Sequence, residues 1–308
     1  QICTQKENSI TGQGHTLAMN LASSEMSPTA NLAHNFGGLK GIKRLKTIRE
    51  KLDDPDTCKN LLEKFKALHQ IVIGGHKQIL SVAEPGTEEK ILTSLEKIWT
   101  EGENLENSSN LVLPTIRNSI TEAWTTATQV NFCAKAFPTV PSSHPDNSKL
   151  HVLAGYLRNG FLHRTIREQG GAYGGGASQD SNSASFRFFS YRDPRLSDTL
   201  DDFDASLEWL LDSKHAEYQL EEAILGVIST LDKPSSPAGE AKQAFYNQLF
   251  GRSLEHRMSF RQQVLSTTLR DLREIVQRYF DPSNASIGVI TNKETAQELK
   301  SEFNIKNI

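Results

Sequence analysis

Residues 165–176, with the sequence TIREQGGAYGGG, bring two strong hydrogen-bond donors close together in the chain. Arg167 carries a permanent positive charge on a forked guanidinium group, and Tyr173 carries a phenolic O–H donor. Donors of this kind stabilise a peptide carbonyl oxygen, or the oxyanion that develops from it during acyl transfer. The segment therefore predicts a site that binds carbonyl groups, with Arg167 and Tyr173 as its two donors.

Five glycines lie within seven positions around Tyr173, namely Gly170, Gly171, Gly174, Gly175 and Gly176. We expect Gly170 to end a helix in the left-handed conformation, which explains one or two of the five. The last three stand where a strand should begin, and glycine weakens a strand unless another group must approach its backbone closely. A phosphate-binding loop does not fit, because neither G-x-x-x-x-G-K-[ST] nor G-x-G-x-x-G is present and because such a loop precedes a helix.

The elements that must position this segment are a helix before it and two strands after it. Apolar residues recur at helical spacing in the preceding stretch: Leu150, Leu153, Leu157, Phe161, Leu162 and Ile166. Residues 177–191 predict two strands joined by a polar loop. Amphipathic helices are expected over residues 194–210, 220–231 and 267–280. Few strands with long helices over one face indicate an α+β fold rather than a doubly wound parallel sheet.

The order of elements suggests two copies of one domain type. Helices are predicted for most of the first hundred residues, with a short strand over residues 78–83, and helix, strand, helix recurs near the C-terminus around Ile287. The polar stretch 101–114 predicts a linker, and the alternating residues 128–137 predict a half-buried strand that opens the second domain. We therefore expect a truncated copy over residues 1–105 and a complete copy over residues 106–308.

Composition excludes several classes of protein. The 308 residues carry a net charge of −3, so no overall positive field attracts nucleic acid or anionic lipid, and no apolar run reaches the length of a membrane span. The basic residues between 40 and 51 are expected to form the solvated face of a helix. Three cysteines far apart, Cys3, Cys58 and Cys133, indicate free thiols rather than a disulfide framework.

No complete active site is visible in the chain. The zinc motifs H-E-x-x-H and H-x-x-E-H do not occur, and neither does the nucleophile motif G-x-S-x-G. We therefore predict no metal site in this chain. Because Arg167 and Tyr173 are donors without a nucleophile or a metal beside them in sequence, they are expected to complete an active site that another part of a protein supplies.

The segment LRNGFLHRTIREQGGAYGGGAS resembles a motif in the C-terminal half of insulinase-type (pitrilysin) zinc metallopeptidases. Its form R-E-Q-G-G-A-Y-G, with arginine six residues before tyrosine, is similar to the presequence protease subgroup. The segments GGLKGIKRLKTI and YRDPRLSDTLDDF also look like that subgroup. The likeness extends from about Gly12 to the end of the chain.

This resemblance implies four homologous two-layer α/β domains, each an antiparallel-rich sheet covered by helices, in two halves that close around a peptide. Residues 1–105 would be the end of the third domain and residues 106–308 the fourth. Zinc would be held by an N-terminal half that is missing here, so this chain alone is expected to be inactive. The partners implied are that catalytic half and short peptide substrates, with no nucleic acid and no membrane; the compartment stays open between an organelle matrix and a bacterial cytoplasm.

The resemblance also assigns roles to the opening segment. Tyr173 would donate to the carbonyl oxygen of the bond being cleaved, and Arg167 would hold a neighbouring carbonyl of the substrate. Arg164 is the alternative arginine, and Gly170, Gly171 and Gly174 would leave room for the substrate backbone. The competing hypothesis is a non-catalytic peptide-binding or scaffold subunit of the same superfamily.

Overall fold

The computed structural model describes residues 2–75, 77–99, 111–212, 214–299 and 301–308. They form two compact units: Gln1–Lys46, Leu113–Asp232 and His256–Ile308 make the first, and Thr47–Val112 with Lys233–Glu255 make the second. The expected boundary between residues 105 and 106, and most of the expected linker, lie outside the described residues. The units divide the chain differently from that boundary, because the first 46 residues pack with the C-terminal part. The assignment to two homologous domains stays a prediction.

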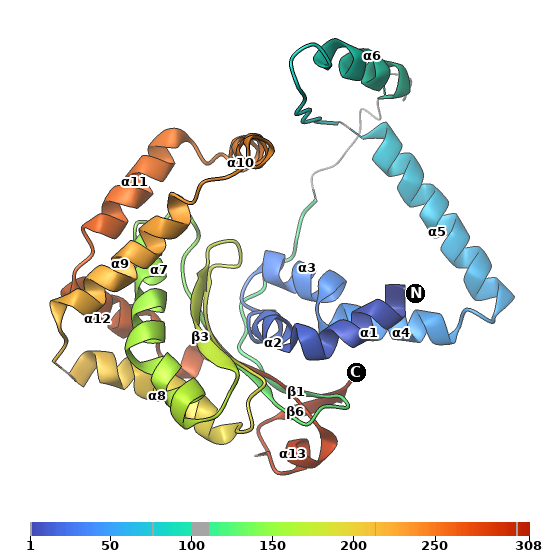
Figure 1. Cartoon of the computed structure of the whole chain (residues 1–308). Helices are drawn as coiled ribbons and strands as arrows, with labels where there is room; N and C mark the ends of the chain where they lie inside the picture. The colour runs from blue at the N-terminus through green and yellow to red at the C-terminus, as the bar shows by residue number, and fades with distance from the viewer. Residues whose placement is uncertain (1, 76, 100–110, 213, 300) are drawn as a thin grey trace. The chain divides into compact units, whose positions relative to one another are not determined.

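A six-stranded mixed sheet forms the centre of the first unit, in the order β3-β4-β2-β5-β1-β6. Its strands are β1 (Thr121–Thr125), β2 (Phe132–Pro138), β3 (Gly174–Asp180), β4 (Ser185–Tyr191), β5 (Ser286–Thr291) and β6 (Asn304–Asn307). The four strands from β3 to β5 pair antiparallel, whereas β1 runs parallel to both of its neighbours, β5 and β6. The predicted hairpin of β3 and β4 is confirmed, and β3 stands at one edge of the sheet (Figure 1).

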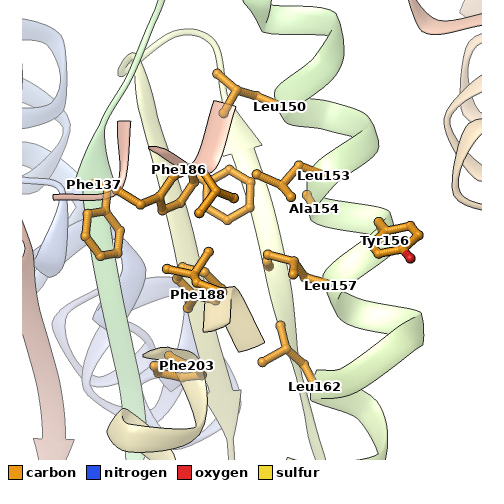
Figure 2. Close-up of a cluster of buried hydrophobic side chains, with 14 of the residues drawn as sticks. Phe137, Leu150, Leu153, Ala154, Tyr156, Leu157, Leu162, Phe186, Phe188 and Phe203 are labelled. Atoms are coloured by element: carbon orange, nitrogen blue, oxygen red, sulfur yellow. The ribbon is translucent and has the colours of Figure 1, made fainter. Parts of the chain in front are cut away.

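Long helices cover one face of this sheet, as the sequence predicts. They are α7 (Asp146–Leu157), its continuation η1 (Arg158–Gln169) and α8 (Ser197–Asp212), with α12 (Leu269–Tyr279) packed against α7 and α8. Two further helices, α9 (Glu217–Leu231) and α11 (Leu254–Leu265), pack against α7 rather than against the strands. The short elements η2 (Pro282–Asn284) and α13 (Lys293–Gln297) flank β5. Between helices and sheet lies an aromatic core in which Phe137, Phe186, Phe188 and Phe203 meet Leu153 and Leu157 of α7 (Figure 2). Burial of these large rings supplies the main favourable contribution to folding of this layer.

The helix that leads into the glycine segment differs from the prediction at its second half. From Arg158 to Gln169 it is a π-helix, and at its start the wider turn moves the buried face on by five residues, from Leu157 to Leu162, before a step of four to Ile166. Leu162 and Ile166 are therefore fully buried after Leu157, whereas Phe161 is only half-buried and packs on Trp209 at 5.8 Å between ring centroids. The predicted apolar stripe is thus correct except at Phe161.

The opposite face of the sheet is covered by the N-terminal residues. The helices there are α1 (Ile2–Gly12), α2 (Gly14–Ala22), α3 (Pro28–Gly37) and α4 (Leu39–Glu50), and α2 packs across β2, β4 and β5. For this reason β2 is buried on both sides, and the expectation that it would be half-buried was wrong. Ser27 caps the start of α3, since its side chain accepts from the N–H of Ala30 at 3.3 Å.

The basic face of α4 is largely exposed, as expected, although two of its lysines also bind the end of the chain. Lys43 donates to the carbonyl of Asn307 at 2.6 Å, and Lys46 donates to that of Ile308 at 3.1 Å. The ammonium group of Lys43 also lies 5.5 Å from the centre of the Trp124 ring. These two lysines therefore lie at the surface and also hold the edge strand β6 and the residue that follows it.

The regular elements described in the second unit are helices. It contains α5 (Pro55–Gly74), α6 (Glu88–Trp99) and α10 (Pro237–Leu249). Asp54 caps α5 by accepting from Thr57. The strand expected over residues 78–83 was wrong, because that stretch forms no strand pairing. No described strand lies beside this stretch, so its backbone groups have no partner with which to form a β-ladder.

Candidate functional site

Tyr173 stands immediately before β3 and presents its phenol to solvent. Its residue is 68% exposed, and its backbone N–H donates to the carbonyl of Arg192 at 3.4 Å. Its ring meets that of Tyr191, at the end of β4, edge to face, with 5.4 Å between centroids and 85° between planes. Among the described residues its hydroxyl has no hydrogen-bond partner, so this donor is available to a ligand.

Arg164 and Arg167 are both exposed and lie in the last turns of η1. Within the described part of the chain neither guanidinium group forms an ion pair or a hydrogen bond. The nearby carboxylate of Glu168 faces His163 rather than either arginine, with 3.5 Å between Oε1 and Nδ1. Both arginines are therefore uncommitted cations, and the structure brings neither into side-chain contact with Tyr173. The choice between Arg167 and Arg164 stays a prediction.

The glycines owe their presence mainly to packing within the protein. A Cβ added at Gly170 would lie 1.9 Å from Nη2 of Arg195, and one added at Gly175 would lie 2.7 Å from Cγ2 of Ile166. Gly176 faces the stem of Arg158, whose Cγ is 3.2 Å from the same position. Only Gly174 of these four has nothing within 4 Å of an added Cβ. Close packing therefore explains the glycines at 170, 175 and 176. It does not explain Gly174, for which space for an approaching substrate is still a possible reason.

Gly171, rather than Gly170, adopts the left-handed conformation at the end of η1. Its φ is +78°, whereas Gly170 has φ −81°, so that expectation was wrong by one residue. The carbonyl of Arg167 accepts from the N–H of Gly171 at 3.2 Å, and that of Ile166 accepts from Ala172 at 3.1 Å. These bonds satisfy the last carbonyls of the helix, and they turn the chain from η1 into β3 within four residues.

The hydrogen-bond pattern of the sheet determines which backbone groups of β3 face outward. Just beyond the paired ends of β2 and β4, the N–H of Thr139 donates to the carbonyl of Ala184 at 2.7 Å. Because hydrogen-bonded positions alternate along an antiparallel pair, residues 186, 188 and 190 of β4 direct their backbone groups to β2. The intervening residues of β4 bond to β3, and Phe189, which is one of them, stands opposite Gly176. The amide and carbonyl groups of Gly175 and Ala177 therefore face the outer side of β3, where the described strand order ends.

A buried polar network holds the turn after β4 and gives structural roles to Asp193 and Arg195 of the segment YRDPR, residues 191–195. Asp193 exchanges backbone hydrogen bonds with Asn131 at 2.7 and 2.9 Å, and its carboxylate accepts from Thr199 Oγ1 at 2.8 Å. Burial raises the pKa of Asp193. Arg195 pairs with Asp202 of α8 at 2.9 Å and also reaches the carbonyl of Thr165 at 3.5 Å. Arg195 thus ties η1 to α8 beneath the segment that carries Tyr173, a role that sequence spacing did not indicate.

One serine and histidine contact resembles a nucleophile pair but does not have the required geometry. Oγ of Ser181 lies 3.2 Å from Nε2 of His151 and donates to Oδ1 of Asn147 at 2.7 Å. Because the serine proton is directed at Asn147, His151 is not placed to remove it. The contact ties the β3–β4 loop to α7, and burial lowers the pKa of His151.

Two other kinds of site find no support among the described residues. In the described ranges, no group of three or more His, Cys, Asp or Glu side chains is placed to hold a metal ion, so these residues do not fit zinc. No described helix combines the length and apolar character that a membrane crossing requires. A surface hollow of about 370 Å³ is lined by Met26, Arg117, Asn118, Ser119, Pro138 and Asn284, and none of the predicted site residues belongs to it.

Comparison of the sequence with family models decides the family. The model described as "PreP C-terminal domain" matches residues 108–290, which is more than half of the chain. The chain belongs to this family. A second model, for a region associated with one subgroup of the M16 peptidases, matches residues 1–48, the part that packs on the sheet through α2.

Curated relatives of this presequence protease family agree. The chain is 30% identical over 297 residues to the mitochondrial presequence protease of Kluyveromyces lactis, and 28% identical over 287 residues to that of Yarrowia lipolytica. These alignments cover 91% and 92% of this chain but only 29% and 28% of the relatives. The chain thus spans less than a third of their length.

Solved structures show the same fold. Pitrilysin superposes on 99% of this chain and 32% of its own, with a TM-score of 0.61 and 15% identity. The inactive M16 peptidase domain from Pseudomonas fluorescens covers 95% of this chain and 69% of its own, with a TM-score of 0.59 and 15% identity. The expected insulinase-type fold, a sheet covered by helices, is therefore confirmed.

Proposed function

We propose that this chain is the substrate-binding C-terminal half of a zinc metalloendopeptidase that degrades short unfolded peptides. The observation that supports this most directly is the exposed phenol of Tyr173, which has no hydrogen-bond partner among the described residues, at the end of an edge strand. A phenolic O–H that projects into solvent can donate to a substrate carbonyl oxygen as that oxygen gains negative charge during cleavage. Zinc and the water that attacks the peptide would come from an N-terminal half.

The surroundings of Tyr173 suit a peptide better than a compact ligand. An extended chain beside β3 would meet the outward amide and carbonyl groups of Gly175 and Ala177, which offer hydrogen bonds without large side chains. At Gly174 its backbone would find open space. Arg167 would hold a carbonyl next to the one that Tyr173 binds, and Arg164 is the alternative for that role.

The test is peptide turnover by the enzyme assembled with its zinc-binding half. Tyr173→Phe removes only the hydroxyl, and we expect kcat/KM to fall by about 100-fold, as it does when one oxyanion donor is lost. Tyr218→Phe is the matched control, since Tyr218 is also exposed, at 59%, but lies on α9. Zinc content should be the same in all variants, and this chain without its partner half should show no turnover.

Two arginine variants assign the second donor. Arg167→Gln should lower kcat/KM by tenfold or more, and Arg164→Gln should change it by less than threefold, because the loss of a charged hydrogen bond costs about 1.5–3 kcal/mol. The reverse order would assign Arg164. If Tyr173→Phe and both arginine variants left turnover unchanged, the chain would instead be a non-catalytic binding or scaffold module.

A further inference from the structure

The exposed position of Tyr173 raises the question of how its hydroxyl is held in place. An exposed side chain ordinarily changes rotamer within picoseconds to nanoseconds, whereas a donor for an oxyanion must be fixed before the charge develops. Among the described residues, no hydrogen bond restrains the phenol of Tyr173. Its ring contacts that of Tyr191, edge to face, with 5.4 Å between centroids. Such pairs contribute attraction beyond the area that they bury, and they favour one relative orientation.

Tyr191 is itself held from several elements. The ring of His15, in the first turn of α2, meets it at 4.7 Å with 66° between planes, and Phe132 of β2 lies 5.9 Å away. The guanidinium group of Arg192 stands over the ring at 5.4 Å from its centre. Nδ1 of His15 is buried and has no hydrogen-bond partner in the described residues, so packing rather than hydrogen bonding accounts for its place there. Tyr191 is thus held on several sides beside the exposed ring of Tyr173.

The residue opposite Tyr191 in the ladder makes this contact possible. Gly174 pairs with Tyr191, and side chains at directly opposed positions share a face of the sheet about 5 Å apart. A larger side chain at Gly174 would occupy the space next to the Tyr191 ring, where nothing now lies within 4 Å of an added Cβ. The ring of Tyr173, one residue earlier, can therefore reach Tyr191 without competition.

We propose that Tyr191 is a positioning residue for Tyr173, and that His15 of α2 braces Tyr191 so that the phenol of Tyr173 points in one direction. The inference rests on the proposed function of Tyr173. It assigns residues 1–46 a part in the site, because the brace comes from a helix that precedes the site by about 150 residues in sequence.

Three variants of the complete enzyme separate positioning from general stability. Tyr191→Phe keeps the ring and should retain kcat within twofold. Tyr191→Leu removes the ring, and we expect kcat to fall about tenfold with KM unchanged, since small misplacement of a catalytic group has costs of this order. Phe189→Leu is the matched control: Phe189 lies two residues earlier on β4, and its ring also contacts His15, with 5.8 Å between centroids, but not that of Tyr173. Its kcat should stay within twofold.

A second measurement does not depend on turnover or on the zinc half. In this chain labelled with ¹³C-tyrosine, NMR relaxation reports the order of the Tyr173 ring, and Tyr173→Phe identifies its signal. Order should fall in Tyr191→Leu and in Gly174→Val, and it should be unchanged in Tyr191→Phe and Phe189→Leu. Gly174→Val supplies the result if Tyr191→Leu does not fold.

The outcomes are distinguishable. If Tyr173→Phe reduces turnover but Tyr191→Leu behaves like Phe189→Leu in both measurements, the positioning role is wrong and the proposed function stands. If Tyr173→Phe leaves turnover unchanged, the proposed role of Tyr173 fails, and the positioning role with it, whatever the NMR result. A loss of ring order in Tyr191→Leu together with a tenfold lower kcat supports both.

Discussion

Gly175 and Ile166 lie so close together that no side chain fits between them. A Cβ added to Gly175 would stand 2.7 Å from Cγ2 of Ile166, a fully buried residue of η1. The start of β3 is therefore fixed against the helix that carries Arg167. We expect Gly175→Ala to lower the free energy of unfolding by about 1–3 kcal/mol, because the core must shift to admit one methyl group.

Gly174 provides the matched control for Gly175→Ala. It is the preceding residue of the same strand, but an added Cβ meets nothing within 4 Å. Urea denaturation of Gly174→Ala should give a free energy of unfolding within about 0.5 kcal/mol of the unchanged chain, as for surface substitutions. Equal losses in the two variants would contradict the packing that separates these glycines.

A second glycine prediction concerns backbone conformation at Gly171. Its φ of +78° lies in the region that side chains disfavour, although its surroundings leave space, with Pro194 Cγ at 3.6 Å from an added Cβ. Gly171→Ala should therefore cost about 1–2 kcal/mol of stability through strain alone. Gly171→Asn should cost less, because asparagine tolerates left-handed backbone better. Thermal or urea unfolding of both variants checks this order.

The sequence predicted the elements around the site well, because their signals are local. The hairpin of β3 and β4 and the helices α8, α9 and α12 follow from periodicity and from turn residues at their ends. The family match likewise confirms the resemblance that began from R-E-Q-G-G-A-Y-G. Tyr173 is exposed, and its hydroxyl has no hydrogen-bond partner among the described residues. Both features agree with a donor role, which stays a prediction.

What the sequence did not predict depends on contacts between distant residues. Strands β1 and β6 are short, and β6 reads NIKN; pairing with β1 and the lysines of α4 hold it in place. The burial of β2 on both faces depends on α2, more than a hundred residues earlier. The π-turn after Leu157 cannot be read from spacing, because Phe161 and Leu162 are both apolar and either fits the stripe.

Burial of His34 predicts a dependence of stability on pH. His34, in the last turn of α3, is 5% exposed, and burial lowers its pKa from 6.5 to about 4. Because the unfolded chain then binds a proton that the folded chain does not, stability is full above pH 6.5 and falls as the pH drops towards about 4. Burial lowers the pKa of His15 and His151 too, so they act in the same direction.

The change that tests this is His34→Gln, which removes the titrating ring. Between pH 7.5 and pH 5.0 the unchanged chain should lose about 2 kcal/mol more stability than the variant, the amount that one proton bound only by the unfolded state contributes. Urea denaturation at the two pH values measures it. His69→Gln, on the exposed surface of α5, is the control and should keep the full pH dependence; a His34 variant that behaved like it would contradict the assignment.

The ion pair of Lys135 and Asp204 predicts a non-additive effect of two substitutions. Lys135 lies on β2 beside Phe137, is only 7% exposed, and places Nζ 2.6 Å from both carboxylate oxygens of Asp204 on α8. Asp204→Ala would leave a buried ammonium group without its anion. We expect a loss of about 2–3 kcal/mol, below the usual cost for a fully buried pair because the Asp204 side chain is 46% exposed.

Lys135→Met should cost less than Asp204→Ala, because its methylene stem already packs in the core and only the charge is removed. In the double variant Lys135→Met with Asp204→Ala, no charge is left uncompensated, so the loss should be smaller than the sum of the single losses by about 1–2 kcal/mol. A double-mutant cycle by urea denaturation at pH 7 measures this coupling. Additive losses would show that solvent, rather than Asp204, stabilises the ammonium group, and that the pair does not hold α8 against β2.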